Sequence, residues 1–147
     1  MILFQSVFKD EDLSSIPNLG VGIHLSTMPN IIFSTSGIQS LLNDLDTNKV
    51  CGPDWISPYI LKHLAEEISP ILQVIFTQSL DTGTLPSDWL SADIRPVLKK
   101  GCHSNPTNCR PISITSICCK TMEHIIYHSV MEHLQYNNIL IDNQHGF

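Results

Sequence analysis

The stretch R-P-V-L-K-K-G-C-H-S-N-P-T-N-C-R-P-I-S-I-T-S-I-C-C-K, from Arg95 to Lys120, decides the fold because the apolar pattern changes there from helical to extended and back. It contains five of the chain's eight Lys and Arg residues and no Asp or Glu. The remaining residues therefore hold three basic side chains and all fourteen acidic ones. This separation of charge predicts a local anion-binding site.

Two short apolar runs flank a polar turn inside this stretch. One run leads up to Lys99, the other follows Arg110, and residues 101–108 between them are rich in Gly, Asn, Ser, Thr and Pro. The pattern predicts an antiparallel β-hairpin that pairs residues 91–98 with residues 110–114. In such a hairpin Lys99 and Arg110 converge on one anion, a point charge beside a planar fork suited to phosphate. Composition alone favours a different interpretation, a solvated basic loop.

Helical patterns precede the hairpin. A first helix begins at one of three capping residues, 34–36, and ends near Asn48. Its apolar face consists of Ile38, Leu41, Leu42 and Leu45. A second helix has Ser57 as its cap and Pro58 in its first turn. Because proline does not fit a helix interior, we expect that helix to end and a third to restart at Ser69 and Pro70, ending at Gly83.

The apolar stripe of these two helices and a last helical pattern complete the chain. The stripe consists of Leu61, Leu64, Ala65, Ile68, Ile71, Leu72, Ile75, Phe76 and Leu80. Thr115 or Ser116 caps the last helix, which ends at residues 137–138. Its face consists of Cys118, Met122, Ile125, Ile126, Ser129, Val130 and Leu134. The predicted fold class is therefore α+β, mostly helical with a small antiparallel hairpin.

Composition bounds the possible functions. The chain has 147 residues, with 42% hydrophobic and 15% charged side chains, which describes one globular or partner-dependent domain rather than a disordered one. A net charge of −6 opposes nucleic-acid binding everywhere except in the basic stretch. Five cysteines without paired spacing indicate free thiols in a reducing compartment. We see no signal peptide and no membrane span, and expect an intracellular protein.

Several sequence words together resemble a known family. They are K-V-C-G-P-D at residues 49–54, L-P-S-D-W at 85–89, P-V-L-K-K-G at 96–101, C-R-P-I-S-I-T-S at 109–116 and N-Q-H-G-F at 143–147. In this order they resemble the start of the reverse transcriptase domain of non-LTR retrotransposons, particularly the jockey-like group. The amino-terminal words F-Q-S-V-F-K-D-E-D-L-S-S-I-P are similar to the connector before that domain. The resemblance covers almost the whole chain.

The resemblance implies a division of the chain and roles for three residues. Residues 1–33 would be a loosely organised connector, and residues 34–147 the fingers portion of a reverse transcriptase domain without palm and thumb. Lys99 and Arg110 would bind the nucleotide triphosphate, and Gln144 would lie near the template. The simpler interpretation is that Arg110 ends a helix or pairs with Asp93, and that Gln144 is an ordinary turn residue.

The full-length family copies RNA into DNA with magnesium, a primer and deoxynucleotide triphosphates. Its metal-binding aspartates follow the segment matched here, and Asp54, Asp88 and Asp93 of this chain match no metal-ligand motif. We therefore expect no bound metal or cofactor, no catalysis by this chain alone, and weak or no nucleic-acid binding. Helix faces that meet the palm in the family would be exposed and would favour self-association. These faces lie around Leu64, Ile68, Leu72, Ile75, Ile125 and Ile126.

A zinc site is an alternative use of the cysteines and histidines. The candidates are Cys102, Cys109, Cys118, Cys119, His103, His124 and His128. His124 and His128 share a helix face, as metal ligands can. However, the chain has no C-x-x-C pair, and adjacent cysteines on a helix point in different directions. Small core residues are the better interpretation of the cysteines.

The chain departs from the family pattern in ways that keep other functions open. Trp55 stands where the family has a second glycine, and a residue that needs positive φ would be strained there. Cys109 and His145 replace aromatic residues, and His124 and His128 replace basic ones. These changes suggest an element that drifts without selection for polymerase activity. The alternatives are a domesticated RNA- or protein-binding module and an unselected remnant without function.

Overall fold

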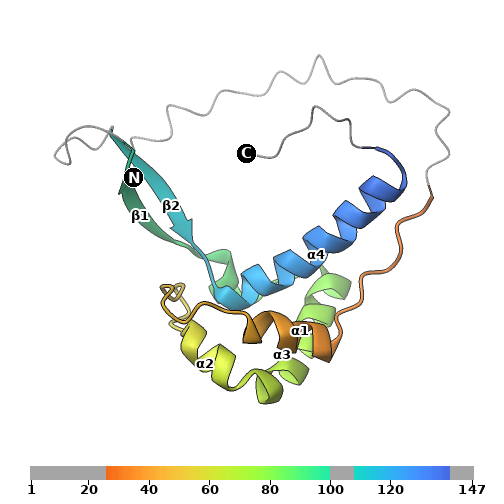
Figure 1. Ribbon diagram of the computed structural model, residues 1–147, viewed down its shortest axis with the longest axis horizontal. Coiled ribbons are helices and arrows are strands. Elements are labelled where there is room, and N and C mark those ends of the chain that lie inside the picture. Colours follow the sequence, from red (N-terminus) through yellow and green to blue (C-terminus); the bar gives the residue numbers. More distant parts are fainter. Residues whose placement is uncertain (1–25, 100–107, 140–147) are drawn as a thin grey trace.

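The computed structural model describes residues 26–99 and 108–139. The elements are α1 (Thr35–Asn43), α2 (Pro58–His63), α3 (Ala65–Thr82), the 3-10 helix η3 (Ser87–Leu90), β1 (Asp93–Leu98), β2 (Cys109–Ile114) and α4 (Ile117–Tyr136). β1 and β2 form a two-stranded antiparallel sheet, so the predicted α+β class, mostly helical with one hairpin, is confirmed. Figure 1 shows this hairpin extending away from the helices.

Phe76 on α3 lies at the centre of the apolar core and is fully buried. The ring of Phe33, which precedes α1, meets it edge-on at a centroid distance of 5.3 Å, and the ring of Trp89 in η3 does so at 5.8 Å. The core cluster consists of Phe33, Ile38, Leu42, Leu61, Ala65, Leu72, Phe76, Ile117, Cys118 and Met122. Aromatic packing thus joins the start of α1 and the approach to the hairpin to one helix.

Three of the four predicted helix starts are confirmed. The hydroxyls of Ser34, Ser57 and Ser116 accept hydrogen bonds from backbone N–H groups two or three residues later, at the starts of α1, α2 and α4. Pro58 occupies the first position of α2, where its missing N–H costs nothing. Gly83 ends α3 in the left-handed conformation, with φ of 64°.

The predicted end of the first helix is wrong. α1 ends at Asn43 with Asp44 as its C-cap, instead of near Asn48. The carboxylate of Asp46 accepts hydrogen bonds from the backbone and side-chain N–H groups of Asn48, and the backbone bond also lowers the pKa of that carboxyl. Asp and Asn side chains that bond locally in this way compete with the helical backbone pattern. The turn therefore replaces the last expected turn of helix.

The predicted restart at Ser69 and Pro70 is also wrong. The break lies at Leu64, whose ψ of 28° is not helical, and α3 continues through Pro70. Ala65, Ser69, Leu72 and Phe76 are all buried and lie along one face of the helix. Keeping that face continuous against the core outweighs the hydrogen bond that proline cannot donate.

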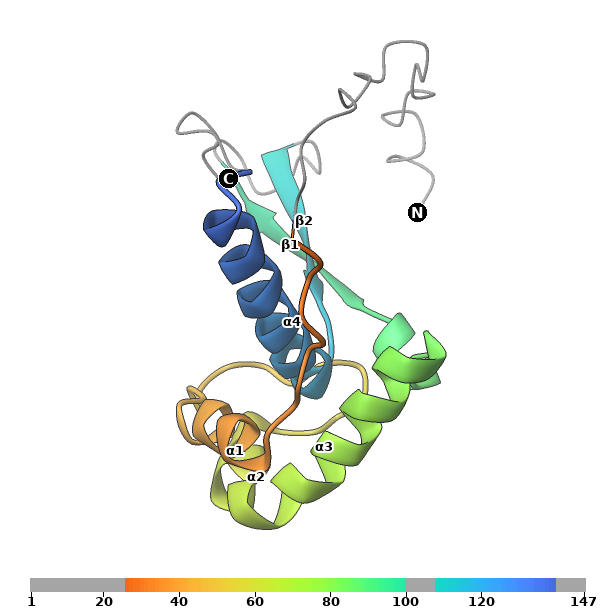
Figure 2. The same ribbon diagram turned by 90° about the vertical axis from the view of Figure 1, so that its right-hand side faces the viewer.

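The last helix and the segment before α1 lie together. α4 has the predicted bounds and buries the predicted face at Cys118 and Met122, whereas that face is only half-buried from Ile125 onward. The hydroxyl of Ser26 donates a 2.8 Å hydrogen bond to the side chain of Asn137. Figure 2 shows residues 26–33 running beside α4. The connector boundary at residue 33 stays a prediction.

Apolar side chains remain on the outside of α2 and α3. Among the residues expected to be left uncovered, Leu64 is 45% exposed, but Leu72 is buried at 4%. Ile68, Ile75, Ile125 and Ile126 are half-buried. The most exposed large side chains on these two helices are Tyr59, Ile60, Ile71 and Val74. Whether this surface makes the chain self-associate stays a prediction.

The expected strain at Trp55 is present. Its φ is +59°, in the left-handed region, and its side chain is 82% exposed. A non-glycine residue in that region costs roughly 1–2 kcal/mol. Because the indole is mostly exposed, little burial offsets this cost.

Replacing Trp55 with glycine is expected to stabilise the fold by about 1 kcal/mol, since relief of the left-handed strain exceeds the entropy that glycine adds to the unfolded chain. Urea unfolding followed by circular dichroism measures this. The matched control is Trp55→Ala, which removes the same indole but keeps the strain, and we expect it to leave the unfolding free energy nearly unchanged. Equal stabilisation by both variants would contradict the strain.

Candidate functional site

The register of the hairpin decides which side chains share a face. Val97 lies opposite Arg110, and Arg95 lies opposite Ile112. The backbone N–H of Lys99 donates a 2.7 Å hydrogen bond to the carbonyl of Asn108, so the pairing continues one residue beyond the strands. Opposing residues point to the same face of a sheet, and so do residues two apart along one strand. Lys99 and Arg110 are therefore diagonal neighbours on one face.

Prolines occupy the outer edges of both strands. The bond from Lys99 to Asn108 identifies these two residues as a hydrogen-bonded pair of the ladder. In an antiparallel ladder, hydrogen-bonded pairs alternate with pairs whose backbone groups point away from the partner strand. Pro96 and Pro111, which face each other, therefore form a pair whose backbone groups point outward. Both outer edges lack an N–H donor at that position, which discourages another strand from adding to the sheet. The two prolines therefore favour a hairpin that stays a two-stranded ribbon.

One face of the ribbon, the basic face, carries Arg95, Lys99 and Arg110, and all three side chains are exposed. Within residues 26–99 and 108–139 none of the three forms an ion pair with a carboxylate. Asp93 lies at the base of the same face, opposite Ile114. The cationic groups are thus free of acidic partners in the described chain and open to an anion from solvent.

The structure brings two of the three predicted site residues together. Lys99 and Arg110 share the basic face, and the alternative in which Arg110 pairs with Asp93 is not observed. Gln144 lies outside the described residues. Sequence analysis missed Arg95 as a member of this face. The signal was its even spacing from Lys99 within one predicted strand, which places both on the same side.

A close backbone contact anchors the ribbon to the helices. The backbone of Gly52 lies so near the junction of β2 and α4 that a Cβ there would be 2.6 Å from the Thr115 carbonyl oxygen. Ser116, the next residue, is completely buried and caps α4. In the same turn, one carboxylate oxygen of Asp54 accepts from the N–H of Ile56, and the other is buried without a hydrogen-bond partner. Only a glycine at position 52 permits the close approach of this turn to Thr115 and Ser116.

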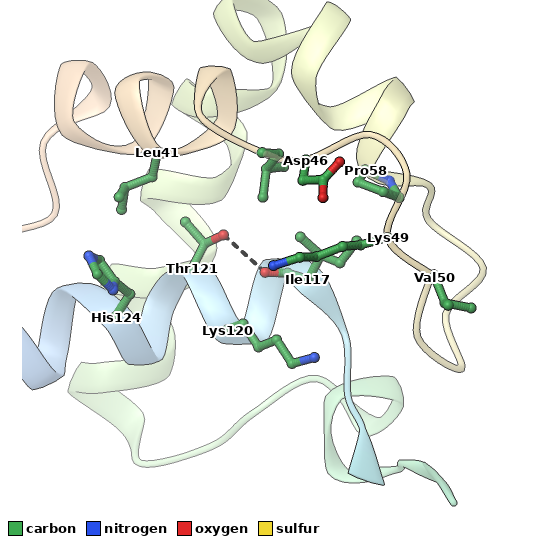
Figure 3. A pocket seen from close by; sticks show the side chains of 10 residues that line it. Leu41, Asp46, Lys49, Val50, Pro58, Ile117, Lys120, Thr121 and His124 are labelled. Carbon is green, nitrogen blue, oxygen red and sulfur yellow. Dashed lines mark hydrogen bonds between the residues drawn. The ribbon is translucent and has the colours of Figure 1, made fainter. Parts of the chain in front are cut away.

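A separate pocket of about 280 Å³ lies between α1, the loop after it and the first half of α4 (Figure 3). Thr121 in its wall donates a hydrogen bond to the carbonyl of Ile117. Its lining consists of Leu41, Leu45, Asp46, Lys49, Val50, Pro58, Ile117, Lys120, Thr121 and His124. None of these residues comes from the hairpin, so the pocket is distinct from the basic face.

Two of the described thiols, those of Cys118 and Cys119, belong to the buried part of α4. Burial, followed by the charge of Asp54, raises the pKa of the Cys118 thiol to about 11. Burial and then the charge of Glu123 raise the pKa of Cys119 to about 11 as well. Among the described residues no three His, Cys, Asp or Glu side chains gather as metal ligands. Both thiols are therefore protonated at neutral pH and act as small core groups.

Comparison with known proteins gives one informative match. No family model matches the chain. The chain is 26% identical over 124 residues to the RNA-directed DNA polymerase from the mobile element jockey of Drosophila melanogaster. The match covers 82% of this chain and 13% of the relative, so the chain spans a small part of that protein's length. The chain is thus similar to a reverse transcriptase of that kind. No described helix is both long and apolar enough to cross a membrane.

We expect Cys118 and Cys119 to react with iodoacetamide at about pH 8 roughly a hundredfold more slowly than in the unfolded chain, since their pKa lies near 11 and not at 9.0. The folded state favours the protonated thiols. The contribution of these thiols to the stability of the folded state is complete below about pH 9 and is lost as the pH rises through about 11. Mass spectrometry of timed alkylation measures the rates. The half-buried Cys51 serves as an internal reference, and equal rates at all three thiols would contradict the account.

Proposed function

We propose that this chain is the connector and fingers portion of a jockey-like reverse transcriptase domain, and that its hairpin holds the triphosphate of an incoming nucleotide. Similarity to the jockey polymerase supports the family, and its extent matches a segment and not a whole enzyme. The observation that carries the proposal is that Lys99 and Arg110 share one exposed face of the ribbon, free of carboxylate partners in the described chain.

The chemistry of the two cations suits a triphosphate. A nucleotide triphosphate presents a compact cluster of negative oxygens. The Lys99 ammonium supplies a point charge, and the Arg110 guanidinium supplies a planar fork that donates two parallel hydrogen bonds to one phosphate. Their diagonal positions on paired strands place the two groups within reach of one ligand. The hydrogen-bonded register of the two strands sets that spacing before the ligand arrives.

We assign no magnesium site to this chain. Nucleotidyl transfer in the family uses two metal ions held by clustered carboxylates. Here Asp54 lies in a loop, Asp88 in η3 and Asp93 in β1, and they form no group of metal ligands. The role we propose for this chain is therefore nucleotide binding within a larger enzyme, without polymerisation by the chain alone.

Titration with a deoxynucleoside triphosphate in the absence of metal tests the proposal. We expect weak binding, with Kd on the order of 1 mM, because two cations meet only part of the phosphate charge. The double variant Lys99→Gln with Arg110→Gln should remove it, whereas Lys49→Glu, which lowers the net charge by the same two units on the loop after α1, should not. Chemical-shift changes of the hairpin amides give the affinity.

Two results would contradict the proposed role. One is a triphosphate affinity that the double variant leaves unchanged, or that the corresponding deoxynucleoside without phosphates reproduces. The other is primer extension by the purified chain with magnesium, primer-template and nucleotides, because the proposal assigns no catalytic carboxylates to this segment. Circular dichroism of each variant establishes that the fold is intact.

A further inference from the structure

The pocket between α1 and α4 has no part in the nucleotide role. Its volume is about 280 Å³, and none of its lining residues belongs to β1 or β2. Pockets that take small molecules have volumes from about 300 Å³ upward. This pocket therefore fits a compact molecule, such as one aromatic ring with a short side arm, and is too small for a nucleoside triphosphate.

Apolar side chains from several elements meet in this pocket. Leu41 and Leu45 come from α1 and the loop after it, Pro58 from α2 and Ile117 from α4. Pro58 and Ile117 are buried, the two leucines are half-buried, and Val50 is 62% exposed. A ligand that covers this surface removes it from water, which favours an apolar body.

Cationic side chains stand at the edge of the apolar surface. Lys49 lies on the loop after α1 and Lys120 on α4, and both are exposed. Figure 3 shows the Lys49 side chain extending from its loop toward α4. His124 lies one helical turn after Lys120, on the same side of α4. Within residues 26–99 and 108–139 neither lysine forms an ion pair with a carboxylate, so both ammonium groups are available to an anion.

Asp46 is the acidic side chain of the lining. Its carboxylate accepts hydrogen bonds from the backbone and side-chain N–H groups of Asn48, and the backbone bond lowers the pKa of that carboxyl. The backbone N–H of Lys49 donates a 3.2 Å hydrogen bond to the carbonyl of Asp46, which holds the turn that carries both side chains. The lining thus has two ammonium groups against one carboxylate, in a chain with a net charge of −6.

We propose that this pocket binds a small carboxylate with an apolar body, an aromatic or medium-length aliphatic acid. The apolar body lies against Leu41, Leu45 and Ile117, and the carboxylate accepts hydrogen bonds from Lys49 and Lys120. A neutral apolar molecule would leave the two ammonium groups without a partner, and inorganic phosphate would leave the apolar surface in water. The site shares no residue with the basic face, so the proposal does not rest on the nucleotide role.

Titration with cinnamate, followed by the chemical shifts of the protein amides, tests this proposal. We expect a Kd of about 1 mM, with the largest shifts at the residues that line the pocket. Cinnamamide has the same shape without the charge and should bind roughly tenfold more weakly. The double variant Lys49→Gln with Lys120→Gln should weaken cinnamate binding to the level of cinnamamide and leave cinnamamide binding unchanged.

A variant with the opposite effect guards against simple loss of the fold. Asp46→Asn removes a like charge but keeps the oxygen that accepts from Asn48, and should tighten cinnamate binding about threefold. Lys99→Gln with Arg110→Gln, an equal loss of charge on the hairpin, should leave cinnamate binding unchanged even where it abolishes triphosphate binding.

Three results would overturn the carboxylate site. They are no cinnamate binding by the wild type, equal affinity for cinnamate and cinnamamide, and shifts confined to the exposed apolar side chains of α2 and α3. Cinnamate binding that depends on Lys49 and Lys120, in a chain that does not bind a deoxynucleoside triphosphate, would refute the nucleotide role and support this one. Circular dichroism establishes that each variant is folded.

Discussion

The approach of Gly52 to the junction between β2 and α4 is the contact on which the rest of the structure depends. An added Cβ at Gly52 would lie 2.6 Å from the Thr115 carbonyl oxygen and 2.7 Å from the Ser116 nitrogen, too close for any side chain. Ser116 is completely buried and caps α4, whose first turn packs into the helical core. β2 ends just before it. Thr115 and Ser116, which Gly52 contacts, therefore fix both the start of a core helix and the base of an exposed ribbon.

Within residues 26–99 and 108–139 the ribbon is anchored at its base, and both of its faces are exposed. The side chains along the middle of both strands are exposed, and only the strand ends are half-buried. A two-stranded hairpin without a packed face is marginally stable, so the exposure of both faces lowers the local stability of the hairpin. Pro96 and Pro111 protect its edges from other strands. The cations on one face, which have no carboxylate partner in the described chain, are the basis of the anion-binding role proposed above.

Local signals in the sequence predicted the helix caps, whereas the error at Pro70 comes from long-range packing and the error at the end of α1 from the local Asp46–Asn48 turn. The caps Ser34, Ser57 and Ser116 and the strain at Trp55 are determined by backbone chemistry within a few residues. Pro70 was misread because a buried face along α3 keeps the helix continuous, and no local pattern reveals that packing. Arg95 was missed although its even spacing from Lys99 places both on one side of the first strand. Only the placement of Arg110 on that side depends on the cross-strand register, which the alternation of apolar residues did not determine.

The register is also the central claim, since a shift by one residue would move Lys99 and Arg110 to opposite faces. Leu98 lies opposite Cys109 in a pair whose backbone groups point outward, where Cα atoms are about 4.5 Å apart and a disulfide fits. The direct measurement is oxidation of Leu98→Cys and, separately, Val97→Cys, with the crosslinks mapped by mass spectrometry. The account predicts a bond from residue 98 to Cys109 and none from residue 97. A bond from residue 97 to Cys109 in place of that from residue 98 would contradict it.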